Sequence, residues 1–351
     1  MLCFESYLTP LATIYRTRLL PAPGLILRRV GDHVASSTVV AEADVSMGYR
    51  FLDMEQMLGV RVHDVRRVLV KRRGETIEQG EVIARAGVLV KTECVSPVTG
   101  QIMDVHGSKV LIEVAPQHIG LAAFYPGKIV NVLSDRGVMI EVTGALIQGM
   151  WGMGEELRAR LERAAPDGDT PLQPHMVSAS HIGTILIGGR TLDAEAISTV
   201  VENKVHAVIV GSIHSDILPV IEAASLSIIL TEGFGDIAMN PHTFELLSSY
   251  VGREACFSPI TKTRWENRRP EIVVPLRAEG EPPVAEYGAP LEVGTRVRVL
   301  RAPYQGNVGQ VMSLPPHRHL IESGIKVRGA EVDLESVGKA FIPFENLEIV
   351  R

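Results

Sequence analysis

Residues 26–43 read Ile-Leu-Arg-Arg-Val-Gly-Asp-His-Val-Ala-Ser-Ser-Thr-Val-Val-Ala-Glu-Ala, and residues 69–86 read Leu-Val-Lys-Arg-Arg-Gly-Glu-Thr-Ile-Glu-Gln-Gly-Glu-Val-Ile-Ala-Arg-Ala. At one constant offset, Gly31 matches Gly74 and Val34 matches Ile77. Each copy places a glycine and an acidic residue between two apolar runs, which predicts a strand, a tight turn and a second strand. Register decides which side chains face the core, so the two copies are expected to form equivalent hairpins in one β-rich domain.

Two further phrases follow the second copy. Ser96-Pro97-Val98-Thr99-Gly100-Gln101-Ile102 leads to a strand ending in Ile112-Glu113-Val114. Tyr125-Pro126-Gly127-Lys128-Ile129 leads to a second strand, ending in Ile140-Glu141-Val142. A helical insert is expected near Leu52–Val65, between the two repeat copies.

These phrases resemble the barrel-sandwich hybrid fold, which biotinyl and lipoyl carrier domains use. The resemblance covers residues 22–142 and implies a fold rather than a reaction. Carrier domains attach their cofactor to a lysine at a hairpin tip, and here that position holds Leu89, with Lys91 two residues later. No cofactor is therefore expected.

The bulk composition is that of a folded, multidomain chain. Its 351 residues are enough for two or three domains. Apolar residues make up 46%, and the net charge of −6 provides no overall attraction for nucleic acid or anionic membranes. The three cysteines, Cys3, Cys94 and Cys256, are widely spaced and predict neither disulfides nor a metal site, which favours a cytoplasmic location.

After residue 150 the pattern changes to apolar strands that alternate with amphipathic helices. This alternation predicts a Rossmann-like α/β domain with a parallel sheet covered on both faces. A short helix is expected at residues 155–164. The later elements are expected as strands 184–187, 207–210, 228–230 and 271–276 and helices 193–203, 215–224 and 241–251, the last with Asn240 as N-cap.

The carboxyl ends of these strands are the candidate ligand site. Ligands of open α/β sheets bind at that edge, where glycine-containing turns present backbone N–H groups to anions. Glycines are also needed simply to turn from strand to helix. The candidates for binding a small anionic ligand are Gly189, Arg190, Gly211, Ser212, Glu232 and Gly233.

The last part of the chain resembles a KOW motif in a small SH3-like barrel. The residues that carry the resemblance are Gly294–Val299 and Pro303–Val311, and Val332, Phe341–Pro343 and Leu347–Val350 would supply later strands. In transcription and translation factors such barrels contact nucleic acid. From Pro290 to Arg351, however, eight basic residues face seven acidic ones, which disfavours a phosphate-binding surface. A local stripe of Arg296, Arg298 and Arg301 keeps that alternative open.

The sequence thus predicts a β-rich domain at 1–150, an α/β domain at 151–276, a Pro- and Gly-containing linker at 277–290 and a barrel at 291–351. No catalytic motif or metal-ligand set stands out, so the leading hypothesis is a non-catalytic cytoplasmic scaffold or adaptor that binds protein partners. One alternative is a nucleic-acid-associated factor that acts through the barrel. The other is an enzyme or redox-complex subunit, because the domain order resembles quinone-reductase and ferredoxin-oxidoreductase subunits.

Overall fold

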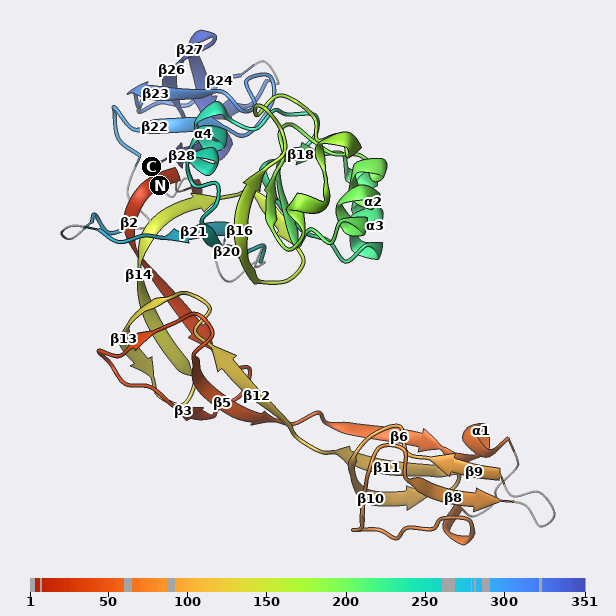
Figure 1. The fold of residues 1–351 in the computed structure, drawn as a ribbon. Coiled ribbons are helices and arrows are strands. Elements are labelled where there is room, and N and C mark those ends of the chain that lie inside the picture. The colour runs from red at the N-terminus through yellow and green to blue at the C-terminus, as the bar shows by residue number, and fades with distance from the viewer. Residues whose placement is uncertain are drawn as a thin grey trace. The chain divides into compact units, whose positions relative to one another are not determined.

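A computed structural model describes residues 4–6, 8–59, 65–86, 92–260, 269–278, 280, 282–285, 291–321 and 324–350, and it is mostly β-structure (Figure 1). Two compact units share the chain. Unit 1 contains Met1–Arg16, Phe124–Lys128 and Ile140–Arg351, whereas unit 2 contains Thr17–Ala123 and Ile129–Met139. The boundaries expected at 150, 276 and 290 all fall inside unit 1.

In unit 2 the two repeat copies form hairpins with the same register. In the first copy Ile26 pairs with Ala41, and in the second Leu69 pairs with Ala84 at the matching positions. The prediction that the two segments form equivalent hairpins is confirmed. Their strands are β3 (Leu25–Ile26), β4 (His33–Val34) and β5 (Val39–Val45) in the first copy, and β7 (Thr76–Ile77) and β8 (Val82–Ala86) in the second.

The glycine turns explain why the phrase is repeated. Gly31 and Gly74 have φ angles of 97° and 89°, a region that side chains with a Cβ rarely adopt. The acidic residue after each glycine closes the turn: Arg29 N donates to Asp32 Oδ2 at 2.9 Å, and Arg72 N donates to Glu75 Oε2 at 3.1 Å. The turn is therefore encoded locally in both copies.

Each hairpin also pairs with one of the two later phrases. Gly74 N donates to Ile102 O at 2.7 Å, and Gly31 N donates to Ile129 O at 2.8 Å. Each repeat thus has two halves, a hairpin and the later phrase that pairs with it. In the sequence, both halves of the second repeat lie between the two halves of the first, so the second repeat is an inserted module. Those halves contain β10 (Gly100–His106) and β11 (Lys109–Val114), and β12 (Gln117–Ala122), β13 (Gly127–Leu133) and β14 (Gly137–Gln148).

The inserted module contains the expected helix in a shortened form. Strand β6 (Tyr49–Asp53) leads into α1 (Met54–Leu58), and a 3₁₀ turn follows at Val65–Arg67. Asp53 caps α1 by accepting a hydrogen bond from Glu55 N at 3.1 Å, and Gly59 ends it at a φ of 66°. The strand order β6-β11-β10-β7 forms one sheet, and β8 pairs with β9 (Thr92–Val95).

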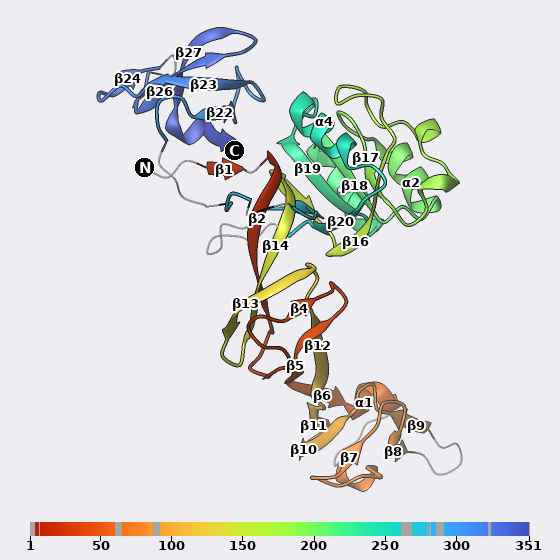
Figure 2. The same ribbon diagram turned by 60° about the vertical axis from the view of Figure 1, so that its left-hand side comes forward.

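In unit 1 the α/β part has both sheet faces covered (Figure 2). Helix α4 packs on the face that contains Ile185 and Ile187, whereas α2 and α3 pack on the face that contains Leu186 and Val208. The positions of these three helices and the Asn240 cap agree with the sequence predictions. The helices are α2 (Ala194–Glu202), α3 (Leu218–Ala223) and α4 (Pro241–Ser249).

The sheet itself differs from the prediction in two respects. Residues 155–164 do not form a helix but contain strand β16, whose alternating burial places Ala159 and Leu161 in the core. The sheet is parallel only from β16 to β19, and antiparallel strands flank that block. The strands are β15 (Trp151–Met153), β16 (Leu157–Arg163), β17 (Ile185–Ile187), β18 (Ala207–Ile213), β19 (Ser227–Phe234), β20 (Glu254–Ser258) and β21 (Glu271–Pro275).

The C-terminal strands form a separate sheet within unit 1, which we call the C-terminal sheet. Its strand order is β1-β28-β22-β23-β26-β27, and the predicted strand positions at Val332, Phe341–Pro343 and Leu347–Val350 are confirmed. The N-terminal strand β1 pairs with β28 in parallel, which the sequence did not indicate. The strands are β1 (Phe4–Ser6), β22 (Arg296–Val299), β23 (Val308–Ser313), β26 (Gly329–Leu334), β27 (Gly338–Pro343) and β28 (Leu347–Val350).

Candidate functional site

The six ligand candidates of the α/β part lie together at the carboxyl ends of β17, β18 and β19. Gly211 N donates to Gly189 O at 2.9 Å, and Ser212 N donates to Arg190 O at 2.8 Å. Ser212 also pairs with Gly233 across β18 and β19. The expected convergence on one sheet edge is thus present, and the role of these residues in binding a ligand stays a prediction.

Two loops, residues 164–172 and 235–240, pack closely against this edge. A Cβ at Gly189 would lie 2.0 Å from Thr170 O, and a Cβ at Gly211 would lie 2.5 Å from Met239 N. Ser212 Oγ accepts from Ile237 N at 2.7 Å and donates to Ile237 O at 2.9 Å. Ser212 therefore holds the second loop by hydrogen bonds. Gly189 and Gly211 leave room for the backbone of the two loops, which a larger residue would not.

Arg190 links the two loops through charge. Its guanidinium group bonds to Asp169 Oδ1 at 2.5 Å and approaches Asp236 Oδ1 at 3.2 Å. Two carboxylates therefore already balance its one positive charge. An anionic ligand at Arg190 would have to displace at least one of them.

Glu232 is part of a buried ionic cluster that we call the Arg298 cluster: Arg298, Glu232, Glu348 and Arg269. Glu232 Oε2 accepts from Arg298 at 2.9 Å, and Arg298 Nε donates to Glu348 Oε2 at 2.8 Å. Arg269 also pairs with Glu348. Burial raises the pKa of the Glu232 carboxyl, and the neighbouring Arg298 guanidinium opposes that shift. The cluster ties the C-terminal sheet to the end of β19.

The arginines of the nucleic-acid alternative do not form one exposed stripe. Arg298 is only 6% exposed because it points into the cluster. Arg296 is exposed and pairs with Glu335 at 3.3 Å, and Arg301 is exposed in a turn. A phosphate-binding surface on this sheet would therefore have to form without the charge of Arg298.

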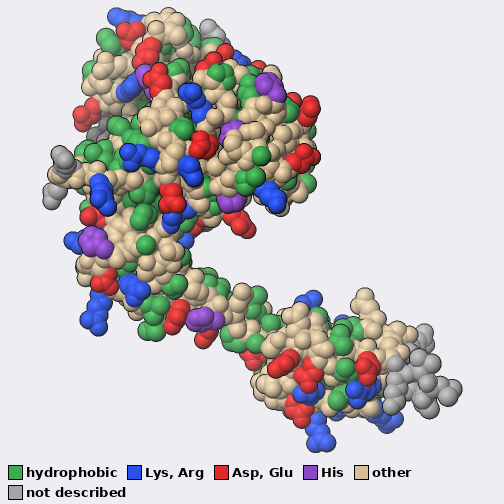
Figure 3. Space-filling model, in the orientation of Figure 1, with side chains coloured by type: hydrophobic (Ala, Val, Ile, Leu, Met, Phe, Trp, Pro, Cys, Tyr) green, Lys and Arg blue, Asp and Glu red, His purple; other side chains and the backbone are tan. Residues whose placement is uncertain are grey.

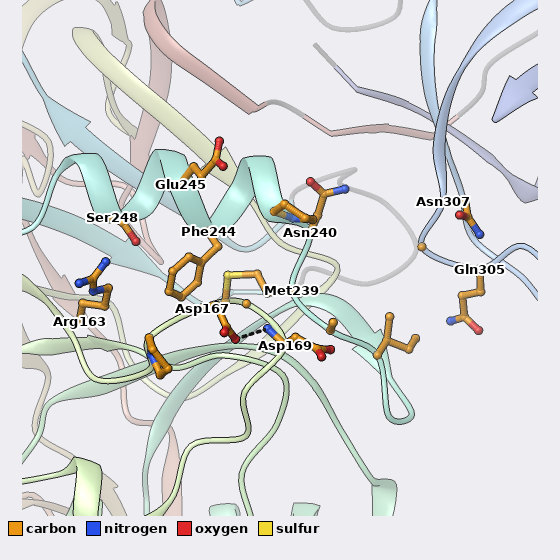
Figure 4. A pocket seen from close by; sticks show the side chains of 16 residues that line it. Arg163, Asp167, Asp169, Met239, Asn240, Phe244, Glu245, Ser248, Gln305 and Asn307 are labelled. Carbon is orange, nitrogen blue, oxygen red and sulfur yellow. Dashed lines mark hydrogen bonds between the residues drawn. The ribbon is translucent and has the colours of Figure 1, made fainter. Parts of the chain in front are cut away.

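A pocket of about 720 Å³ opens beside the two loops (Figure 4). None of the six sequence candidates lines it; they lie behind its walls. Residues 166–169 and 237–241 form two walls, α4 contributes Phe244, and residues 305–307 come from the connection between β22 and β23. The Asp-Gly-Asp sequence at 167–169 is the local signal that could have indicated this wall.

A different candidate surface lies in unit 2, on strand β6. Tyr49 and Phe51 are 62% and 68% exposed, and both belong to the outer strand of their sheet. In the described part of the chain, β6 pairs with β11 alone. Hydrophobic side chains reach the surface of the lobe to which β6 belongs (Figure 3).

Within the described residues, no cluster of three or more His, Cys, Asp or Glu side chains suits a metal ion. His181 Nδ1 accepts a hydrogen bond from Ser178 N at 3.1 Å, and the His319 ring stacks on Phe341. Burial raises the pKa of the Cys256 thiol to about 12, so this sulfur is protonated at neutral pH. Leu89 and Lys91, the positions compared with carrier domains, lie outside the described residues.

Across the described residues, the structure contains no helix with the length and apolar character needed to cross a membrane. No protein-family model matches the chain, and no curated protein matches its sequence.

Proposed function

We propose that the protein is a non-catalytic adaptor that binds an extended segment of a partner protein along strand β6. The observation that carries this proposal is the pair of exposed aromatic side chains, Tyr49 and Phe51, on an outer strand with one unpaired edge among the described residues. Aromatic residues dominate the binding energy of protein interfaces, and unpaired strand edges accept additional strands.

The register supports this proposal. Phe51 lies opposite Leu111 on β11, and Tyr49 lies opposite Glu113, so the two aromatic rings share one face of the sheet. Leu52, the residue after Phe51, faces the opposite side of the strand, is 5% exposed and packs into the core of this module. The strand is therefore held from one face and presents apolar contacts on the other.

A first test replaces both aromatic residues by serine. Because both side chains are exposed, Tyr49→Ser with Phe51→Ser should leave the fold intact and weaken partner binding by at least about 30-fold, as expected for the loss of an interface hot spot. A photoreactive amino acid at position 51 identifies the partner by cross-linking in cells. Calorimetry with that purified partner then measures the affinity.

The matched control is Val70→Ser, which removes an apolar side chain, 47% exposed, from the same unit. It should leave the affinity for the partner unchanged. The adaptor proposal fails if the double variant binds as the unmodified chain does, or if position 51 cross-links only to another copy of this chain.

A further inference from the structure

The pocket beside the two loops has an acidic lining. Asp167, Asp169 and Glu245 contribute carboxylates, and Arg163 is the basic side chain among the lining residues. Asp169 shares its charge with Arg190, whereas Asp167 forms no ion pair in the described structure. The charges that face this space therefore favour a positively charged ligand over a negatively charged one.

Asp167 has a fixed position and a fixed charge. Its Oδ1 accepts hydrogen bonds from Asp169 N at 3.0 Å and from Thr170 N at 2.7 Å. Hydrogen bonds from the side chain and backbone of Thr170 lower the pKa of the Asp167 carboxyl, so it is ionised at neutral pH. Both bonds use the same oxygen, and Oδ2 receives neither of them.

The N-terminal end of α4, which borders the pocket, offers little to an anion. Asn240 N already donates to Glu232 Oε1 at 3.2 Å, and His242 N donates to the Asn240 side chain at 2.9 Å. Pro241 has no N–H group. Of the groups that could hold a phosphate at this helix start, two N–H groups are thus engaged and one is missing.

The interior of the pocket is apolar. Phe244 is 7% exposed and Met239 is 1% exposed, and both lie at the centre of the view in Figure 4, with Asp167 beside them. An aromatic ring next to a carboxylate suits an ammonium group through charge pairing and cation–π attraction. The volume of about 720 Å³ is within the range of small-molecule sites.

The pocket is also built from fixed parts. Gly306 lies against Ile237, since a Cβ on it would be 3.4 Å from Ile237 Cγ2. The Arg298 cluster holds the C-terminal sheet at this edge, and Arg190 joins the two loops. A preformed site loses less conformational entropy on binding.

We infer that this pocket binds a small organic amine, with Asp167 as the counter-ion of the ammonium group and Phe244 and Met239 in contact with its apolar body. The inference is independent of the adaptor function, because it concerns unit 1 and a different class of ligand. It concerns other residues than the six at which the sequence predicts a small anionic ligand.

Calorimetry on the full chain tests the inference with three probes: tyramine, 4-ethylphenol (which has the same ring without the amine) and inorganic phosphate. Tyramine should bind saturably, and 4-ethylphenol should bind at least about tenfold more weakly. Asp167→Asn should weaken tyramine binding by about tenfold or more, because the amide retains the turn hydrogen bonds but has no charge. Asp216→Asn makes the same change at an exposed site in the α/β part and should have no effect.

Three results would overturn the inference. These are no saturable binding of tyramine, tighter binding of phosphate than of tyramine, or equal tyramine affinities of the Asp167→Asn and Asp216→Asn variants. Far-ultraviolet circular dichroism of each variant shows whether the fold is retained, so that a loss of affinity is assigned to the carboxylate.

Discussion

Arg298→Met is expected to destabilise unit 1 by about 3–5 kcal/mol, the usual cost of removing one partner from a buried ion pair. Arg298 is 6% exposed and contacts both Glu232 and Glu348. Without the guanidinium group, Glu232 loses its ionic partner while it remains buried at 8% exposure. Urea denaturation followed by tryptophan fluorescence measures the loss of stability.

Arg296→Met is the control on the same strand. Arg296 is exposed, and its pairing with Glu335 at 3.3 Å is of the surface type that contributes about 0–1 kcal/mol. A much larger loss of stability in Arg298→Met than in Arg296→Met would show that the effect comes from the burial of the Arg298 ion pairs. Equal and small losses for both would show that the Arg298 cluster does not hold the C-terminal sheet to the α/β part.

Glu271→Gln is expected to have an effect of similar size in another part of unit 1. Glu271 is 2% exposed and accepts two hydrogen bonds from Arg16, at 2.6 and 2.5 Å, and one from Tyr125 Oη at 2.9 Å. The amide keeps the shape of the side chain but removes the negative charge that pairs with the buried Arg16 guanidinium. We expect the free energy of unfolding, measured by urea denaturation, to fall by about 3–5 kcal/mol.

Glu254→Gln provides the comparison for this variant. Glu254 is on the neighbouring strand β20 and pairs with Arg158 at 2.8 Å, but its side chain is 71% exposed. Its replacement should cost at most about 1 kcal/mol. If Glu271→Gln were as mild as Glu254→Gln, the three segments that meet at Glu271 would not depend on this charge.

The parts of the fold that the sequence predicted well are those encoded by short-range signals. Gly31 and Gly74 adopt the positive φ angles that their repeated phrase implies, and Asn240 caps α4 as expected. In these cases, a few neighbouring residues contain the whole physical reason for the local structure. In α2, Ile197 and Val200 lie on the buried face as their spacing predicts, whereas Val201 is 41% exposed.

The parts that the sequence did not predict depend on distant partners. Residues 157–163 contain good helix formers, yet they form a strand because β17 and β20 pair with both of its edges. Arg298 looks like a surface arginine until Glu232 and Glu348 are brought beside it by the tertiary fold. The pocket needs three separate chain segments, so its lining could not be assembled from local patterns.

Hydrogen–deuterium exchange of the complex with its cross-linked partner tests the adaptor proposal most directly. A strand added along β6 would bond to its free backbone groups, so the amides of residues 49–53 should exchange more slowly in the complex than in the free chain. The C-terminal sheet should be unaffected. Protection confined to β22, β23, β26 and β27, with exchange at residues 49–53 unchanged, would contradict the proposal that β6 is the binding edge.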